Sequence, residues 1–306
     1  MNSLEYVVNQ DYKKAESSFK YLIDKYPNSE VGYYLLSSIY ATEMMDFEYK
    51  GKEKEFYETL KQGYKIVDSK DEDNLSSWDG YFKAGLKIVE NGYKIRRGSV
   101  TAVFSGKSAM GLNNKFYAKD TNNADLAFYS GFYFYGMSKV WEKFSWMGAD
   151  TKQDIKDAIK LLKKSENESI FSRNVSTQTL INIYFENGMY EKAKKDGVDF
   201  LKIYPENRAV KWAMAKMYKK KKIPKQAIKY YEELFVFFET VVDEYPYNYF
   251  NLCDEISELY VKIGDKESSK KYINYAIKQK NQLPKKYDDR IDDFVDNCED
   301  RLDDME

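Results

Sequence analysis

One spacing of tyrosine and small residues recurs along the chain and limits the folds that it can adopt. Tyr184 is followed nine residues later by Ala193, and 34 residues further on the same pair returns as Tyr218 and Ala227. The positions four and seven residues beyond each alanine stay on one face of a helix. This pattern predicts a pair of helices in which a tyrosine near the end of the first helix packs on a small residue early in the second.

Further copies of the spacing occur at both ends of the chain. Tyr6 precedes Ala15 by nine residues, and Tyr260 precedes Ser269 by nine. Four prolines follow helical runs and stop them, namely Pro27, Pro205, Pro246 and Pro284. A helix pair of this size cannot bury its apolar face alone, so neighbouring pairs must stack on it and form a solenoid.

The pattern resembles the tetratricopeptide repeat (TPR). The Tyr, Ala, Phe and Pro slots of that family are matched between Tyr184 and Pro205, and "SEVGYYLLSSIY", Ser29–Tyr40, has the form of its first helix. The resemblance implies an all-α fold, a right-handed superhelical solenoid of helix-turn-helix repeats whose first helices form a concave surface. It also implies a non-catalytic scaffold or adaptor for protein–protein interaction, which binds a peptide or protein on that surface.

We expect the repeats to occupy residues 1–284 and to be regular at 1–40 and 172–284, with an irregular, aromatic-rich middle at 77–150. An acidic amphipathic helix at 285–306 should cap the solenoid. Its apolar residues recur at intervals of three and four, and they are Tyr287, Ile291, Phe294, Cys298, Leu302 and Met305. The alternative is an acidic tail that grips a basic partner.

The segment "GKS" at 106–108 matches the end of a nucleotide-binding P-loop. That motif needs a glycine five residues before its second glycine, where this chain has Thr101. It also needs a preceding buried strand, but "GYKIRRGS" is basic and polar. The repeat spacing instead places Gly106 where Gly197 lies, on the inward face of a second helix. We therefore expect Gly106 to lie in a helix, to touch a neighbouring helix and to be overpacked by a larger side chain.

The composition removes several classes of catalysis. The chain of 306 residues has no histidine and two cysteines, so it lacks the usual general base and cannot form a four-ligand zinc site of cysteine and histidine. We expect no catalytic residue, no metal and no cofactor. The formal net charge is −1 and no stretch approaches the ~20 apolar residues of a membrane span, so we expect neither nucleic-acid binding nor a transmembrane segment.

The candidate partner-binding residues lie on the first helices of the expected repeats. They are Tyr34, Gln178, Asn182, Trp212, Lys216, Asp254 and Glu258. Their character changes from polar to basic to acidic, unlike the Lys, Asn and Arg set that holds a C-terminal carboxylate in chaperone-binding TPR grooves. The basic run "KKKKIPK", Lys219–Lys225, is interpreted as a solvated turn between helices. The identity of the partner and the oligomeric state stay open.

An aromatic segment in the middle of the chain offers an alternative function. "LAFYSGFYFYG", Leu126–Gly136, holds six aromatic residues in eleven, and not all of them can face inward on a 3.6-residue period. We expect most of them to be core and at least two to be exposed. The alternative is a small-molecule or glycan-binding protein, with a ligand patch made of Tyr129, Tyr133, Trp141 and Trp146.

The chain also resembles a group of bacterial envelope TPR-like proteins that share no established activity. The matching segments are "GYYLLSSIY" (Gly32–Tyr40), "DLAFYSGFYFYGMSK" (Asp125–Lys139) and "YPENRAVKWAMAKMY" (Tyr204–Tyr218). In addition, only about one and a half turns of a normal first helix precede the first repeat turn. These features imply a leader upstream of Met1 and a periplasmic or cell-envelope location. A cytoplasmic protein with a short native first helix is the alternative.

Two further expectations concern the C-terminal repeats. The step from Tyr218 to Tyr260 is 42 residues, eight more than the preceding step, and the segment Ala227–Pro246 has no internal helix breaker. We therefore expect its helix to be longer by about two turns. Cys253 and Cys298 should be free thiols, about 16 Å apart if the capping helix continues the register of the repeats.

Overall fold

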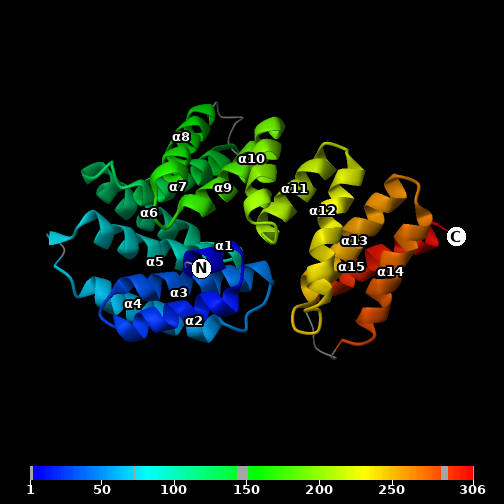
Figure 1. Cartoon of the computed structure of the whole chain (residues 1–306), viewed down its shortest axis with the longest axis horizontal. Coiled ribbons are helices and arrows are strands. Elements are labelled where there is room, and N and C mark those ends of the chain that lie inside the picture. Colours follow the sequence, from blue (N-terminus) through cyan, green and yellow to red (C-terminus); the bar gives the residue numbers. More distant parts are fainter. Residues whose placement is uncertain (1–2, 72–73, 143–150, 284–288, 306) are drawn as a thin grey trace. The chain divides into compact units, whose positions relative to one another are not determined.

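The computed structural model describes residues 3–71, 74–142, 151–283 and 289–305. Within these ranges the chain forms fifteen α-helices and no strand, which confirms the all-α class. Turns of three residues, 187–189, 221–223 and 263–265, join the helices of three successive pairs (Figure 1).

Contacts divide the chain into two compact units. The first unit comprises residues 1–45 and 50–189, and the second comprises residues 46–49 and 190–306. The division therefore falls inside the expected repeat domain and not at residue 284, because the capping helix belongs to the same unit as the repeats that precede it.

The helices of the first unit are α1 (Ser3–Val8), α2 (Tyr12–Lys25), α3 (Glu30–Asp46), α4 (Glu53–Asp68), α5 (Ser77–Arg96), α6 (Thr101–Lys119), α7 (Ala124–Glu142), α8 (Lys152–Glu168) and α9 (Arg173–Glu186), the last residue of α3 being counted with the second unit. The helices of the second unit are α10 (Tyr190–Ile203), α11 (Arg208–Lys220), α12 (Pro224–Glu239), α13 (Pro246–Lys262), α14 (Lys266–Lys280) and α15 (Arg290–Asp303).

Three tyrosines from three helices meet in the core of the first unit. The hydroxyl of Tyr34 in α3 is hydrogen-bonded to that of Tyr81 in α5 at 2.9 Å and to that of Tyr129 in α7 at 2.7 Å. All three side chains are buried. The buried carboxylate of Asp125 accepts three backbone N–H groups immediately before α9, at 2.8 to 2.9 Å. These polar groups are buried with partners, so they tie α3, α5, α7 and α9 together.

Two glycines of the first unit differ in the room around them. Gly106 lies within α6, as predicted, and a β-carbon there would meet Asn91 of α5 at 3.8 Å, an ordinary contact distance. At Gly80 of α5, a β-carbon would meet the ring of Phe116 at 2.1 Å. The approach of α5 and α6 that requires a glycine therefore occurs at Gly80, and the expectation that Gly106 is tightly packed is wrong.

The second unit contains the expected helix hairpins. Helix α11 packs on α12, and α13 packs on α14. The small residues early in the two second helices, Ala227 and Ser269, are fully buried. The Ser269 hydroxyl also donates to the backbone carbonyl of Ser257 in α13 at 3.0 Å. The small-residue slot of the sequence repeat is therefore the place where the two helices of a hairpin meet.

Residues 46–49, the last residue of α3 and the three that follow it, are part of the second unit. The ring of Phe47 stacks on that of Tyr245 with 4.2 Å between centroids. Arg208 of α11 donates to one carboxylate oxygen of Asp46 from Nε at 3.0 Å and from Nη2 at 2.5 Å. Both charged side chains are buried. These four residues thus fill a place in the core of the second unit with an aromatic ring and an ion pair.

The eight additional residues between the last two hairpins are divided among three places. Helix α12 has 16 residues against 14 in α10, and α13 has 17 against 13 in α11. The connection Thr240–Tyr245 is two residues longer than Tyr204–Asn207. The expectation of one helix extended by about two turns is therefore wrong. Phe237, near the end of α12, packs under the guanidinium of Arg208, with 4.1 Å between its Cζ atom and the ring centre.

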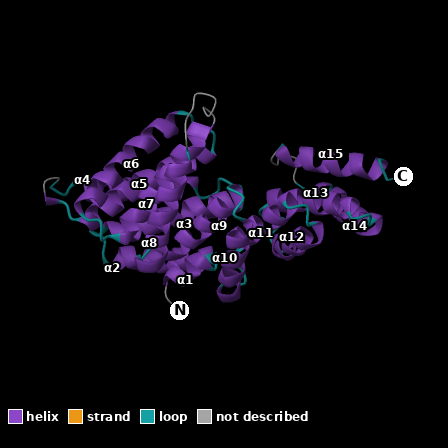
Figure 2. Cartoon of the chain, turned by 90° about the horizontal axis from the view of Figure 1, so that it is seen from above, coloured by secondary structure: helices purple, strands orange, loops and turns teal. Residues whose placement is uncertain are grey.

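Helix α15 lies along α13 and α14 (Figure 2). Ile291, Val295 and Cys298 of its apolar stripe are fully buried. Arg301 donates to the carboxylate of Asp254 at 2.7 Å and to the hydroxyl of Ser257 at 2.6 Å. The C-terminal segment is therefore a packed amphipathic helix.

The register of α15 differs from the one expected. The Sγ atom of Cys298 lies 3.9 Å from the Ser257 hydroxyl, one helical turn from Cys253 on α13. The expectation that α15 continues the register of the repeats is therefore wrong, because the ion pair of Arg301 with Asp254 sets another alignment. Both cysteines are free and buried, as predicted.

Candidate functional site

The second unit contains a cavity of about 610 Å³ bounded by α11, α12 and α13, here named the lysine cavity. The charged residues that line it are Lys216, Lys219, Lys220, Lys222, Lys262 and Glu255. Pro224, Tyr231 and Leu259 give it an apolar part. Five ammonium groups therefore surround a space that has one carboxylate among its described lining residues.

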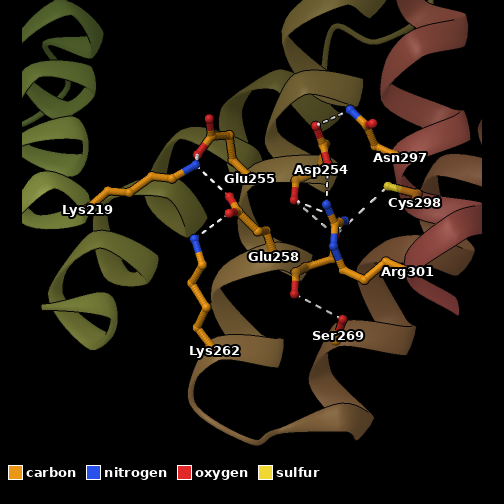
Figure 3. Close-up of polar contacts among 10 residues, drawn as sticks. Lys219, Asp254, Glu255, Glu258, Lys262, Ser269, Asn297, Cys298 and Arg301 are labelled. Atoms are coloured by element: carbon orange, nitrogen blue, oxygen red, sulfur yellow. Dashed lines mark hydrogen bonds and ion pairs between the residues drawn. The ribbon is translucent and has the colours of Figure 1, made fainter. Parts of the chain in front are cut away.

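A network of ion pairs holds two of these lysines in place (Figure 3). The ammonium of Lys219 in α11 lies 2.6 Å from a carboxylate oxygen of Glu255 and 2.6 Å from one of Glu258, both in α13. Glu258 also accepts a hydrogen bond from Lys262, one turn further along α13. The network joins α11 to α13 at the edge of the cavity.

The same network shifts the pKa values of Lys219 and Glu258 in the directions that keep both groups ionised at neutral pH. Burial lowers the pKa of Lys219, but its hydrogen bonds to Glu255 and Glu258 outweigh burial and raise that pKa above its usual value. Burial raises the pKa of Glu258, and its bonds to Lys219 and Lys262 outweigh burial and lower that pKa. These side chains are partly exposed, so each pair contributes only about 0–1 kcal/mol to stability. Their main effect is to fix the directions of the lysine side chains.

Aromatic rings support the cavity from α11 and α12. The Tyr231 side chain is 1% exposed, and its burial, followed by the nearby charge of Glu255, raises the pKa of its hydroxyl. The ring of Trp212 packs edge-on against that of Tyr231 with 5.6 Å between centroids. The ammonium of Lys216 lies 5.5 Å from the centre of the Trp212 ring. Rigid rings thus position one further lysine of the lining.

The turn between α11 and α12 places Lys222 in an unusual conformation. Its φ is 56°, in the left-handed region that residues with a β-carbon rarely adopt. In the neighbouring hairpins, Gly188 and Gly264 have φ of 74° and 80° at the corresponding turns. This turn therefore has a lysine where the turns before and after it have glycine.

The predicted groove residues of the second unit separate onto two sides of α13. Lys216 lines the lysine cavity, while Trp212 and Glu258 contact residues that line it. Asp254 instead faces α15, where it accepts hydrogen bonds from Arg301 at 2.7 Å and Asn297 at 3.1 Å (Figure 3). The capping helix therefore occupies the side of α13 that carries Asp254.

The predicted groove residues of the first unit lie on α3 and α9. Tyr34 is buried in the tyrosine cluster, so it is a core residue and offers no surface to a partner. Gln178 is half-buried and Asn182 is exposed. The role of Gln178 and Asn182 in partner binding stays a prediction.

The predicted aromatic ligand patch is described only in part. Tyr129 is buried in the tyrosine cluster and Tyr133 is half-buried. The Trp141 side chain and the whole of Trp146 lie outside the described residues. Of the six aromatic residues in Leu126–Gly136 only Phe132 is exposed, so the expectation of at least two is wrong. The reason is that α7 packs against α5, α6, α8 and α9, which leaves little free surface.

Sequence reasoning missed most of the lysine cavity. The run Lys219–Lys225 was interpreted as a solvated turn, and Lys262 was not considered. A signal was nevertheless present, because a shift of 34 residues from Gly188 reaches Lys222, where the repeat needs a left-handed residue. A lysine at such a position is a departure from the repeat that has a physical cost.

Within the described part of the chain, no helix has the length and apolarity needed to cross a membrane. In the same residues, no group of three or more His, Cys, Asp or Glu side chains is placed to hold a metal ion.

The chain has similarities to solved structures. One is the C-terminal part of a TPR repeat-containing protein from Cytophaga hutchinsonii, with 16% identity, a TM-score of 0.49, and coverage of 96% of this chain and 98% of the other. A tetratricopeptide repeat protein from Parabacteroides merdae has 13% identity and a TM-score of 0.43, with coverage of 97% and 95%. The human IFIT1 dimer with PPP-AAAA has 12% identity and a TM-score of 0.46, with coverage of 89% and 69%. No protein-family model and no curated protein matches the sequence.

Proposed function

We propose that the chain is a non-catalytic scaffold whose second unit holds a segment of a partner protein in the lysine cavity. The observation that carries this proposal is the cavity itself, about 610 Å³ in volume and lined by charged and apolar side chains together. A mixed lining of this kind suits a peptide, which brings both polar and apolar groups.

The position of the cavity agrees with the same proposal. Helices α11 and α13 are the first helices of their hairpins, and first helices form the surface on which a repeat scaffold is expected to bind. Lys219 is held by two ion pairs and Lys216 lies over the Trp212 ring, so these two side chains lose little freedom when a ligand binds.

Site-specific photo-cross-linking tests the proposal. A photoreactive phenylalanine analogue at Lys220, on the cavity lining, should give a covalent adduct with one partner protein in cells of the source organism. The same analogue at Lys13, an exposed position of α2, serves as the control and should not give that adduct. The adduct protein, purified, should bind the wild-type chain directly. Equal adducts from both positions, or no adduct from Lys220, would contradict the proposal.

The envelope location stays part of the proposal and rests on the sequence resemblance alone. Cell fractionation with an antibody against the chain would test it, and recovery in the cytosolic fraction would contradict it.

A further inference from the structure

The lining of the lysine cavity has a surplus of positive charge. Five lysines line the cavity, against the carboxylate of Glu255 in the described lining and that of Glu258, which pairs with Lys219 and Lys262 at the edge. Of these lysines, Lys216 and Lys222 are exposed, while Lys219 is held at the edge by two glutamates. The electrostatic complement of such a lining is a group with more than one negative charge.

The type of cationic side chain in the lining restricts the chemical class of the ligand further. The described residues that line the cavity include no arginine, whose planar fork suits the two oxygens of a carboxylate. Lysine ammonium groups are separate point charges, and here they come from α11, from the turn after it and from α13. A phosphoryl group carries about −1.5 to −2 charges and three acceptor oxygens, so it can accept from several ammonium groups at once.

The apolar residues of the lining also suit a phosphorylated ligand. Tyr231 is buried and packs against Trp212, and Pro224 and Leu259 also line the space. An apolar surface beside a cationic one suits a phosphorylated side chain that remains attached to a peptide, because the residues beside the phosphate bury their carbon atoms there.

The backbone at Lys222 is left-handed, with φ of 56°, where the hairpins on either side have glycine. Gln10 has the same φ in the turn between α1 and α2, so this conformation is a feature of such turns and does not by itself indicate a ligand. At Lys222 it brings a further lysine to the cavity lining.

We infer that the lysine cavity binds a phosphorylated segment of the partner protein, with Lys216, Lys220 and Lys222 as the lysines that contact the phosphate. The inference rests on the proposed function and deepens it, since it gives the chemical class of the bound segment.

Fluorescence polarisation with the full chain tests the inference. The probes are fluorescein-labelled degenerate peptide pools with a fixed central phosphoserine, phosphothreonine or phosphotyrosine, together with pools that have the unphosphorylated residue or glutamate at that position. At least one phosphorylated pool should bind about tenfold or more tightly than its unphosphorylated and glutamate counterparts. Its affinity should fall as salt is raised, because the lysines are exposed.

Substitutions of lysine residues test whether the phosphopeptide binds in the lysine cavity. Replacing Lys216, Lys220 and Lys222 with glutamine should abolish the preference for the phosphorylated pool. The matched control replaces Lys229, Lys271 and Lys278, three exposed lysines of the second unit outside the lining, and it should keep the preference. The single change Lys222→Gly should weaken phosphopeptide binding about threefold or more without loss of folding.

The other outcomes are also decisive. Equal binding of phosphorylated and unphosphorylated pools overturns the phosphate inference and leaves the photo-cross-linking test of the proposed function unaffected. Competition by inorganic pyrophosphate or ATP that is as strong as that of unlabelled phosphopeptide would assign the cavity to a free phosphate compound, which overturns the peptide ligand. An equal loss in the control triple variant would show general charge attraction, which overturns the site.

Discussion

At the scale of single residues, the left-handed turns of the chain contain either glycine or a residue with a β-carbon. Gly188 and Gly264 adopt left-handed turns, and Gly80 allows two helices to approach. Lys222 adopts a left-handed conformation without the freedom of glycine. Stability and binding are therefore expected to respond in opposite directions at this position.

Lys222→Gly should stabilise the second unit by about 0.5–1 kcal/mol. Relief of the left-handed strain, about 1–2 kcal/mol for a residue with a β-carbon, is partly offset by the greater freedom of glycine in the unfolded chain. Urea denaturation followed by circular dichroism and by hydrogen exchange in the second unit would measure the change. The reverse substitution Gly264→Lys should destabilise the same unit. A lowered urea midpoint for Lys222→Gly would refute the strain argument.

Gly80→Ala and Gly106→Ala should differ in sign, although both glycines lie in helices that pack together. The new methyl group at Gly80 meets the rigid Phe116 ring, so the change should destabilise the first unit by about 1–3 kcal/mol. At Gly106 there is room, and alanine is the better helix former, so the change should stabilise by up to about 1 kcal/mol. The melting temperatures of the two variants and the wild type test this prediction. An equal loss of stability in both variants would contradict the packing described for the two glycines.

At the scale of helices, the sequence predicted the elements well and their alignment poorly. The nine-residue spacing from tyrosine to a small residue placed Ala227 and Ser269 correctly at the buried meeting points of their hairpins. The register of α15 could not be obtained in this way, because its apolar stripe allows several alignments that differ by one turn. The ion pair of Arg301 with Asp254 selects among them, and that contact spans 47 residues of sequence.

The lysine cavity could not be predicted from the sequence for the same reason, because it depends on the alignment of separate helices. Lysines in one stretch of sequence look like a solvated turn, and only the packing of α13 beside α11 adds Lys262 and Glu255 to them. The fold class and the helix pairs were therefore accessible from local spacing. The site depends on which residues of two separate helices come together. The spacing of residues within one segment carries no information about such contacts.

Cys298 should report on the packing of α15. Burial, and then the charge of Asp254, raise the pKa of its thiol to about 11. Alkylation by iodoacetamide should therefore be slow at neutral pH and should accelerate as pH rises towards that value. Arg301→Gln removes the ion pair to Asp254, so it should increase the alkylation rate of Cys298 about tenfold or more through easier opening of α15.

The control for this measurement is Asp296→Asn, an exposed change on the same helix, which should leave the rate unchanged. Mass spectrometry of alkylated peptides gives the rate for each cysteine. A Cys298 that reacts in the wild type as fast as in urea would show that α15 does not cover it.

At the scale of the whole molecule, the second unit is not a continuous stretch of chain. It takes residues 46–49 from far upstream, and the buried pair of Asp46 with Arg208 joins positions 162 residues apart. No local pattern in the sequence indicates this pair. A buried ion pair is costly to break on one side only, because the remaining charge loses its partner.

Asp46→Asn should therefore destabilise the second unit by about 3 kcal/mol, since it removes the negative charge that pairs with the buried guanidinium of Arg208. Asp199→Asn removes an exposed carboxylate that pairs with Lys202 one turn away, and it should change stability by less than about 0.5 kcal/mol. Urea denaturation of both variants, with hydrogen exchange to assign the loss to the second unit, makes the comparison. Equal effects would mean that the Asp46 pair is not buried in solution.

The dependence of the second unit on residues 46–49 has a consequence during protein synthesis. Asp46 and Glu48 leave the ribosome long before their partners, since Arg208, Asn248 and Arg290 follow 162, 202 and 242 residues later. The C-terminal helices therefore complete their core on a segment made near the start of translation, and contacts of such long sequence separation form slowly. A gene fragment that begins at residue 190 encodes all six C-terminal helices and still lacks the piece that closes their core.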